Sequence, residues 1–148
     1  MIKTVASVMI ARPVPEVFAY STRIAHFPTW FRDVVREARQ TSTGPLAAGT
    51  TFTLVAEFLG RRIELLFAVT AYEPDRRFCI ATRWGVLPFE GCFHYEPAAG
   101  GTLLTDRHSI GATGLFDLVG SLLVTRLRQQ AETNLANLKR ILEASSAG

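Results

Sequence analysis

Two side chains that could exchange protons with a substrate stand two positions apart in the sequence. Side chains on a strand point to its two faces in turn. In the predicted strand at 102–110, Asp106 and His108 therefore lie on the same face as the apolar Leu104 and Ile110. We expect this apolar face to point inward. A carboxylate that orients an imidazole is an arrangement for general acid–base catalysis, and a buried polar pair must be hydrogen-bonded. Asp106 and His108 are therefore either catalytic residues or a structural pair.

Few other residues suggest chemistry. Tyr95 shares the apolar face of residues 89–95 with Phe93, where its hydroxyl could orient a ligand or be satisfied within the core. The sequence contains no phosphate-binding glycine loop, no zinc-protease motif and no nucleophile elbow. Its three histidines and two cysteines lack the spacing of metal ligands. We therefore expect no metal and no cofactor.

The two cysteines, Cys79 and Cys92, fall on the polar faces of their predicted strands. Two cysteines without a CxxC motif do not predict a disulfide framework, so we expect both to be reduced. Residues 1–12 alternate in polarity instead of forming the apolar block of a signal peptide. These features predict a cytoplasmic protein.

Composition is that of a globular domain. The 148 residues are 48% hydrophobic and 20% charged, with a net charge of +3, and we expect a single domain over residues 1–148 with a loose tail at 144–148. The basic residues are spread along the chain, which argues against nucleic acid as a partner. No apolar run is long enough for stable membrane insertion. We expect a monomer or a homodimer.

The longest predicted element is a helix over residues 115–143. Apolar residues recur there at intervals of three, four and once five, which is the spacing of one helical face. Residues between them, such as Gln130 and Asn137, are of types expected to face solvent, and Arg126 is expected to be a solvated charge. Roughly 30 helical residues span about 45 Å, so a wide surface must cover the apolar stripe. The more apolar first half could also roof a ligand cavity.

The remaining chain predicts the surface that covers this helix. Period-two patterns and turn residues indicate seven strands, at 3–11, 33–43, 51–59, 62–72, 78–84, 89–95 and 102–110. Two short helices are predicted between the first two strands. The later strands have hairpin-length connections, so the sheet should be antiparallel. At about 4.8 Å per strand, seven strands give a sheet roughly 34 Å wide, which can curl around the long helix.

Several short motifs, in this order, resemble one family. They are IARPVPEVF at 10–18, FPTWF at 27–31, GTTF at 49–52, VTAYEP at 69–74, GGT at 100–102 and LKRILE at 138–143. Together they resemble the START/Bet v 1-like (SRPBCC) superfamily, and in particular its polyketide cyclase/dehydrase and lipid-transport group. The resemblance implies an α+β helix-grip fold, in which a seven-stranded antiparallel sheet wraps the C-terminal helix and leaves a cavity beside it.

The resemblance also implies a ligand. Family members bind hydrophobic molecules, so the favoured expectation is a cavity that binds a lipid, a polyketide or another aromatic or isoprenoid-like molecule. The residues expected to contact it are Trp30, Phe52, Leu54, Phe67, Trp84, Phe93, Tyr95, Leu104, Phe116, Val119 and Leu123. The alternative is a polyketide cyclase/aromatase or dehydratase that uses Asp106 and His108 as its acid–base pair. A third hypothesis is a partner-binding module whose cavity is vestigial.

Overall fold

The protein is described by a computed structural model that covers residues 2–58, 60–84, 88–111 and 120–144. Within these ranges, seven strands form one antiparallel sheet in the order β1-β7-β6-β5-β4-β3-β2. The strands are β1 (Ile2–Ile10), β2 (Val35–Gln40), β3 (Thr51–Phe58), β4 (Arg61–Glu73), β5 (Arg77–Trp84), β6 (Phe89–Ala98) and β7 (Gly101–Ile110). The helices are α1 (Val14–Ser21), a 3-10 turn (Ile24–His26), α2 (Phe27–Trp30) and α4 (Gly120–Ala144). The predicted order of elements and the α+β class are confirmed.

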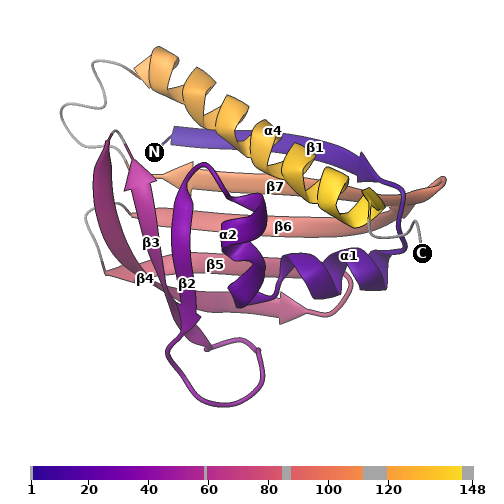
Figure 1. Cartoon of the computed structure of the whole chain (residues 1–148), viewed down its shortest axis with the longest axis horizontal. Coiled ribbons are helices and arrows are strands. Elements are labelled where there is room, and N and C mark those ends of the chain that lie inside the picture. The colour runs from indigo at the N-terminus through magenta and orange to yellow at the C-terminus, as the bar shows by residue number, and fades with distance from the viewer. Residues whose placement is uncertain (1, 59, 85–87, 112–119, 145–148) are drawn as a thin grey trace.

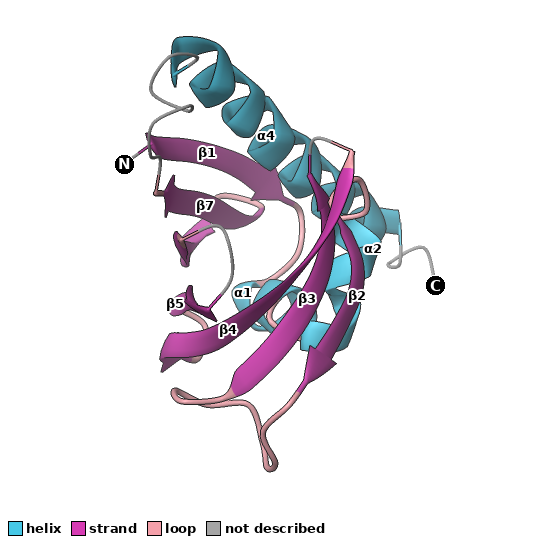
Figure 2. Cartoon of the chain, turned by 90° about the vertical axis from the view of Figure 1, so that its left-hand side faces the viewer, coloured by secondary structure: helices cyan, strands magenta, loops and turns pink. Residues whose placement is uncertain are grey.

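The sheet is strongly bent, and helices α1, α2 and α4 lie on its concave side (Figure 1 and Figure 2). The register shifts between Val35 and Glu37 in β2, and again between Leu66 and Phe67 and between Val69 and Ala71 in β4. Such bulges increase the local twist of a strand. They fall in the half of the sheet that turns toward the helices, which explains how seven strands enclose an interior.

The core is built from the inward face of each strand and from α1 and α2. Pro15 lies in the first turn of α1, where proline costs no hydrogen bond. The aromatic cluster predicted at the second short helix is deeply buried, with Phe27 at 2% and Trp30 at 0% exposure. Phe27 packs against Phe52 with ring centroids 5.7 Å apart. These rings fill the space between α2 and the sheet.

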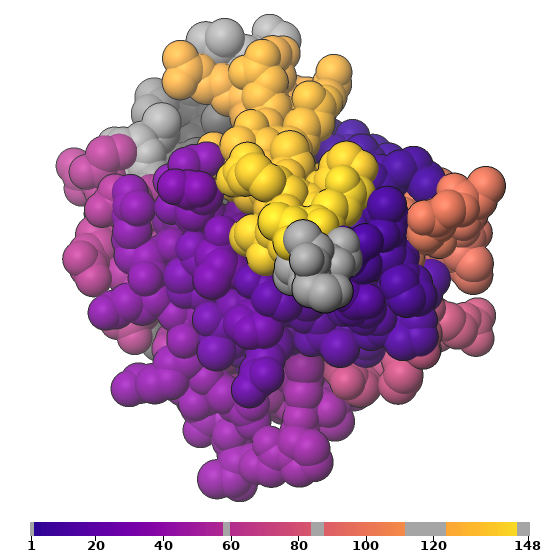
Figure 3. Space-filling model, turned by 45° about the vertical axis from the view of Figure 1, so that its right-hand side comes forward, coloured from indigo at the N-terminus to yellow at the C-terminus, as the bar shows by residue number. Residues whose placement is uncertain are grey.

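Helix α4 packs on β1 and against α2. Its buried stripe contains Ala131, Leu135, Leu138 and Leu142, as the spacing predicts, while its outer side is open to solvent (Figure 3). The expectation that Asn137 faces solvent is wrong. This residue is 6% exposed.

Asn137 can be buried because both ends of its side-chain amide form hydrogen bonds. Its Nδ2 atom donates to the backbone oxygen of Trp30 at 3.2 Å, and its Oδ1 atom accepts from Arg140 at 2.9 Å. The first five residues of the predicted helix, 115–119, lie outside the described residues.

Side chains at the C-terminal end of α4 form hydrogen bonds with the backbone at the end of β1. Lys139 donates to the backbone oxygen of Met9 at 2.6 Å, and the Glu143 carboxylate accepts from the backbone N–H of Ala11 at 2.8 Å. Lys139 and Glu143 also form an ion pair at 2.7 Å. These contacts satisfy two backbone groups at the end of β1, the oxygen of Met9 and the N–H of Ala11, which would otherwise need water.

The expectation that the cysteines are reduced is wrong, because Cys79 and Cys92 form a disulfide. They face each other across the β5–β6 pairing, with Cα atoms 4.1 Å apart. Sequence alternation places both on the outer face, as observed, but gives no register between strands. Disulfides are typical of oxidising compartments, so the cysteines no longer support the prediction of a cytoplasmic protein.

None of the described helices is long and apolar enough to cross a membrane.

Candidate functional site

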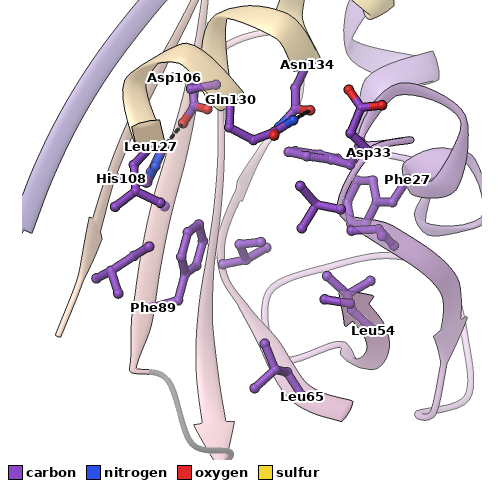
Figure 4. A pocket seen from close by; sticks show the side chains of 18 of the residues that line it. Phe27, Asp33, Leu54, Leu65, Phe89, Asp106, His108, Leu127, Gln130 and Asn134 are labelled. Atoms are coloured by element: carbon purple, nitrogen blue, oxygen red, sulfur yellow. Dashed lines mark hydrogen bonds and ion pairs between the residues drawn. The ribbon is translucent and has the colours of Figure 1, made fainter. Parts of the chain in front are cut away.

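A cavity of about 350 Å³ lies between the concave face of the sheet, α2 and α4 (Figure 4). Its apolar wall comes from the inward positions of β3, β4, β5 and β6, and this volume falls within the range of small-molecule sites. The wall includes Leu54, Ile63, Leu65, Phe67, Ile80 and Phe93. The alternation of each strand places these side chains on one face, so the apolar wall is a direct consequence of the strand pattern.

One side of the cavity is polar and is formed by β7. Asp106 and His108 both line the cavity, and their side chains are only 6% and 9% exposed. The Nδ1 atom of His108 lies 3.2 Å from Oδ1 of Asp106. The Nε2 atom of His108 lies 2.8 Å from the hydroxyl of Thr4 on β1, because the β1–β7 register pairs Thr4 with His108.

This network decides which atom can meet a ligand. When Nδ1–H of His108 donates to Asp106, Nε2 accepts the hydroxyl proton of Thr4, so both ring nitrogens are occupied within the protein. The second carboxylate oxygen of Asp106, Oδ2, has no hydrogen-bond partner among the described residues. Asp106 therefore presents the available acceptor, and His108 orients it.

The position of His108 is fixed by its neighbours on β6. Its ring stacks on Phe89 with centroids 5.3 Å apart and an interplanar angle of 27°. Gly91, its partner across the β6–β7 pairing, leaves the room for this stack: a Cβ atom there would lie 3.0 Å from the Phe89 ring and 3.3 Å from Cβ of His108. The absence of a side chain at Gly91 thus shapes this part of the cavity.

Helix α4 contributes two amides to the same cavity. Gln130 and Asn134 lie one turn apart and both line it (Figure 4). Nε2 of Gln130 donates to Oδ1 of Asn134 at 3.0 Å. The expectation that Gln130 faces solvent is wrong, since it lines the cavity and is half-buried. A helical period of 3.6 places residues 127, 130, 131 and 134 on one face, and this signal could have identified both amides.

Three charged residues lie where the cavity meets solvent. Asp33, Glu57 and Arg126 line it and are exposed. The side-chain hydrogen bond from Arg36 lowers the pKa of Glu57, and the two groups are 3.0 Å apart. The rim is therefore charged and hydrated, while the interior is apolar apart from the β7 and α4 side chains.

The predicted ligand-contacting residues divide into three groups. Leu54, Phe67 and Phe93 line the cavity with Asp106 and His108. Four others are buried in the core and do not line it: Trp30, Phe52, Tyr95 and Leu104. Phe116 and Val119 lie outside the described residues, as do the side chains of Trp84 and Leu123.

Tyr95 is a core tyrosine with a satisfied hydroxyl. Its oxygen lies 2.7 Å from the hydroxyl of Ser21, and Ser21 donates to the backbone oxygen of Val17. The side chain is packed against Phe18. Burial raises the pKa of Tyr95 well above its usual range, so the phenol stays neutral at neutral pH.

The sequence patterns did not identify Phe27, Phe89 and Ile63 as lining residues. Phe89 opens β6, and its inward parity was available from the strand pattern. Among the described residues, no group of three or more potential metal ligands comes together.

The fold and the cavity define a helix-grip protein with a mainly apolar internal cavity that opens to solvent at a charged rim. A family model described as polyketide cyclase / dehydrase and lipid transport matches residues 1–143. The chain belongs to this polyketide cyclase/dehydrase and lipid transport family.

Solved structures share the fold at low sequence identity. The chain is similar to TTHA0849 from Thermus thermophilus, with a TM-score of 0.84 and 17% identity over 98% of this chain and 99% of that one. It is similar to a START superfamily protein from Mycobacterium smegmatis, with a TM-score of 0.70 and 14% identity over 97% and 95%.

A further similar structure is the di-domain ARO/CYC StfQ from the steffimycin biosynthetic pathway, with a TM-score of 0.77 and 14% identity. The match covers 99% of this chain and 52% of that one. No curated protein matches the chain in sequence. At these identities the structural matches show the fold alone.

Proposed function

We propose that the protein binds a hydrophobic small molecule in the cavity between the sheet and α4. The observation that carries the proposal is an unfilled volume of about 350 Å³ whose wall is mainly apolar. Cores are normally packed without voids larger than a water molecule. An apolar cavity of this size is the form that small-molecule sites take, and membership of a lipid-transport and cyclase family supports the same reading.

Filling the cavity tests this proposal. Ala131 on α4 lines the cavity and is 2% exposed, so Ala131→Phe would place a ring in the ligand's volume. Ala136, five residues along the same helix, is exposed, and Ala136→Phe is the matched control. The probe is N-phenyl-1-naphthylamine, which is uncharged and fluoresces in apolar surroundings.

The expected result is saturable binding of one probe per chain to the natural protein and to Ala136→Phe, with at least a tenfold loss of affinity in Ala131→Phe. Circular dichroism checks that each variant is folded. Equal binding by all three proteins would place the probe elsewhere and would contradict the proposal.

A second candidate function is acid–base catalysis of the cyclase/aromatase or dehydratase kind. It is favoured by the position of Asp106 and His108 in the cavity wall, with one oxygen of the Asp106 carboxylate unpaired among the described residues. Asp106 would remove a proton from the carbon next to a ligand carbonyl, leaving an enolate, and return it at another atom. His108 would act as a positioning residue.

Proton exchange tests this second candidate without knowledge of the substrate. The methyl protons of 2-acetylnaphthalene exchange with D₂O when a base removes them, and NMR measures the rate. The candidate predicts faster exchange with the protein than in buffer, lost in Asp106→Asn and reduced in His108→Gln. Exchange that is not accelerated by the natural protein, although the ketone binds, would exclude this chemistry.

A further inference from the structure

The buried amide of Asn134 has an unused hydrogen-bond donor. Asn134 is 5% exposed and lines the cavity. Its Oδ1 atom accepts from Nε2 of Gln130 at 3.0 Å, whereas its Nδ2 atom has no hydrogen-bond partner among the described residues. Since the contact with Gln130 occupies the oxygen, the orientation of the amide leaves its N–H groups as the side that remains to be satisfied.

The neighbouring Asn137 shows how a structural asparagine on this helix is used. Its Nδ2 atom donates to the backbone of Trp30 and its Oδ1 atom accepts from Arg140, so both ends of the amide are paired. Asn134 is as deeply buried and, within the described part of the chain, is paired at one end alone. Nδ2 of Asn134 is not one of the polar atoms sealed within the described core, so an acceptor can reach it from the cavity that this residue lines.

We propose that Asn134 recognises a carbonyl oxygen of the ligand by donating a hydrogen bond from Nδ2, with Gln130 as the residue that orients the amide. This inference rests on the proposed function, because it assigns a polar feature to the ligand of that cavity. Nδ2 requires an acceptor, and a carbonyl oxygen is an acceptor with no proton of its own.

The charges around the cavity favour an uncharged ketone or aldehyde over a carboxylate. The buried part of the cavity already holds the Asp106 carboxylate, which disfavours a second buried anion. Among the described residues, the one arginine that lines the cavity, Arg126, is exposed at the rim. The ligand class that fits is therefore an apolar, uncharged molecule that carries a carbonyl group.

A matched pair of ligands tests this assignment. 2-Acetylnaphthalene and 2-isopropenylnaphthalene have almost the same shape, and differ in that the first has a carbonyl oxygen where the second has a CH₂ group. Calorimetry gives the ratio of their affinities for the natural protein. The variants are Asn134→Leu and Asn134→Asp, both of which remove the N–H donors. Gln129→Glu, at an exposed position of the same helix, repeats the amide-to-carboxylate change as a control.

A net hydrogen bond corresponds to about a 2- to 10-fold change in affinity. We expect the ketone-to-alkene affinity ratio to fall by about this factor in both Asn134 variants and to stay unchanged in Gln129→Glu. A ratio that is the same in the natural protein and the Asn134 variants would overturn the role of Asn134 while leaving ligand binding intact. Failure of both naphthalenes to bind the natural protein would instead count against the proposed function.

A measurement on the natural protein covers the case in which a variant does not fold. The infrared stretch of a ¹³C-labelled carbonyl in bound 2-acetylnaphthalene moves to lower frequency when the oxygen accepts a hydrogen bond. We expect the bound ketone to absorb below its frequency in hexane. An unshifted band in the bound state would overturn the inference.

Discussion

His108 Nδ1 and Asp106 Oδ1 lie 3.2 Å apart in the wall of an otherwise apolar cavity. The pair is completed by Thr4 on the neighbouring strand. This arrangement satisfies the imidazole entirely within the protein and leaves one oxygen of the carboxylate toward the cavity. The same two residues therefore form a hydrogen-bonded network and also supply the polar side of the cavity wall on β7.

The first prediction concerns the stability of this pair. His108→Leu removes the partner of a buried carboxylate, and Asp106→Leu removes the partner of a buried imidazole. Each change should lower the free energy of unfolding by about 2–3 kcal/mol, because a buried polar group is left unsatisfied. The double variant should cost less than the sum, since it removes both groups together. Urea unfolding of the four proteins gives the coupling free energy, and strict additivity would show that the two side chains do not interact.

The second prediction concerns the disulfide between Cys79 and Cys92, which are 13 residues apart. Closing a loop of this length stabilises a protein by about 3 kcal/mol in the chain-entropy description. Unfolding in urea with and without a reductant measures this contribution. The Cys79→Ala/Cys92→Ala variant is the control and should not respond to the reductant. Two titratable thiols in the native, unreduced protein would contradict the bond.

The third prediction uses the buried phenol of Tyr95. Burial raises its pKa above the unfolded value of about 10, so the unfolded chain loses the proton first as the pH rises. The free energy of unfolding should therefore be independent of this group below about pH 10 and should fall above that pH. Tyr95→Phe should flatten the decline, and it should cost about 1 kcal/mol at neutral pH through the lost hydrogen bond to Ser21. The same alkaline slope in both proteins would contradict the assignment.

The fourth prediction concerns the hydrogen bonds between α4 and the end of β1. The hydrogen bond from Lys139 lowers the pKa of Glu143, with a further contribution from the backbone N–H of Ala11. A lowered pKa adds stability above the unfolded value of about 4.3, and this stability is lost as the pH falls through the lower folded value. Glu143→Gln should reduce the loss of stability on acidification.

A second glutamate of the same helix provides the control for this measurement. Glu132 is exposed. Glu132→Gln should change the fall in the free energy of unfolding on acidification less than Glu143→Gln does. Unfolding measured between pH 3 and 7 compares the three chains. An unaltered acid slope in Glu143→Gln would show that the carboxylate is not held by these donors.

Much of the fold could be predicted from local patterns. Alternation along β7 placed Asp106 and His108 on the face with Leu104, and the structure has them pointing inward. The helical spacing predicted the buried positions Leu135 and Leu138. These predictions succeed because they depend on the geometry of one element at a time.

The features that the sequence did not predict depend on how strands and helices pack against one another. The Cys79–Cys92 bond requires the register between β5 and β6, which alternation within a strand does not contain. Trp30 and Phe52 were expected to contact the ligand, but both are buried in the core between α2 and the sheet and do not line the cavity. Asn134 and Gln130 were overlooked because residue type, taken alone, suggests solvent. Only the cavity beside α4 explains their position.

Native mass spectrometry of the folded protein incubated with 2-isopropenylnaphthalene tests the central claim most directly. We predict one added ligand mass per chain for the natural protein and for Ala136→Phe, and its loss in Ala131→Phe and after unfolding. A natural protein that keeps its unliganded mass at every ligand concentration, while remaining folded, would contradict the claim that this cavity binds a hydrophobic molecule.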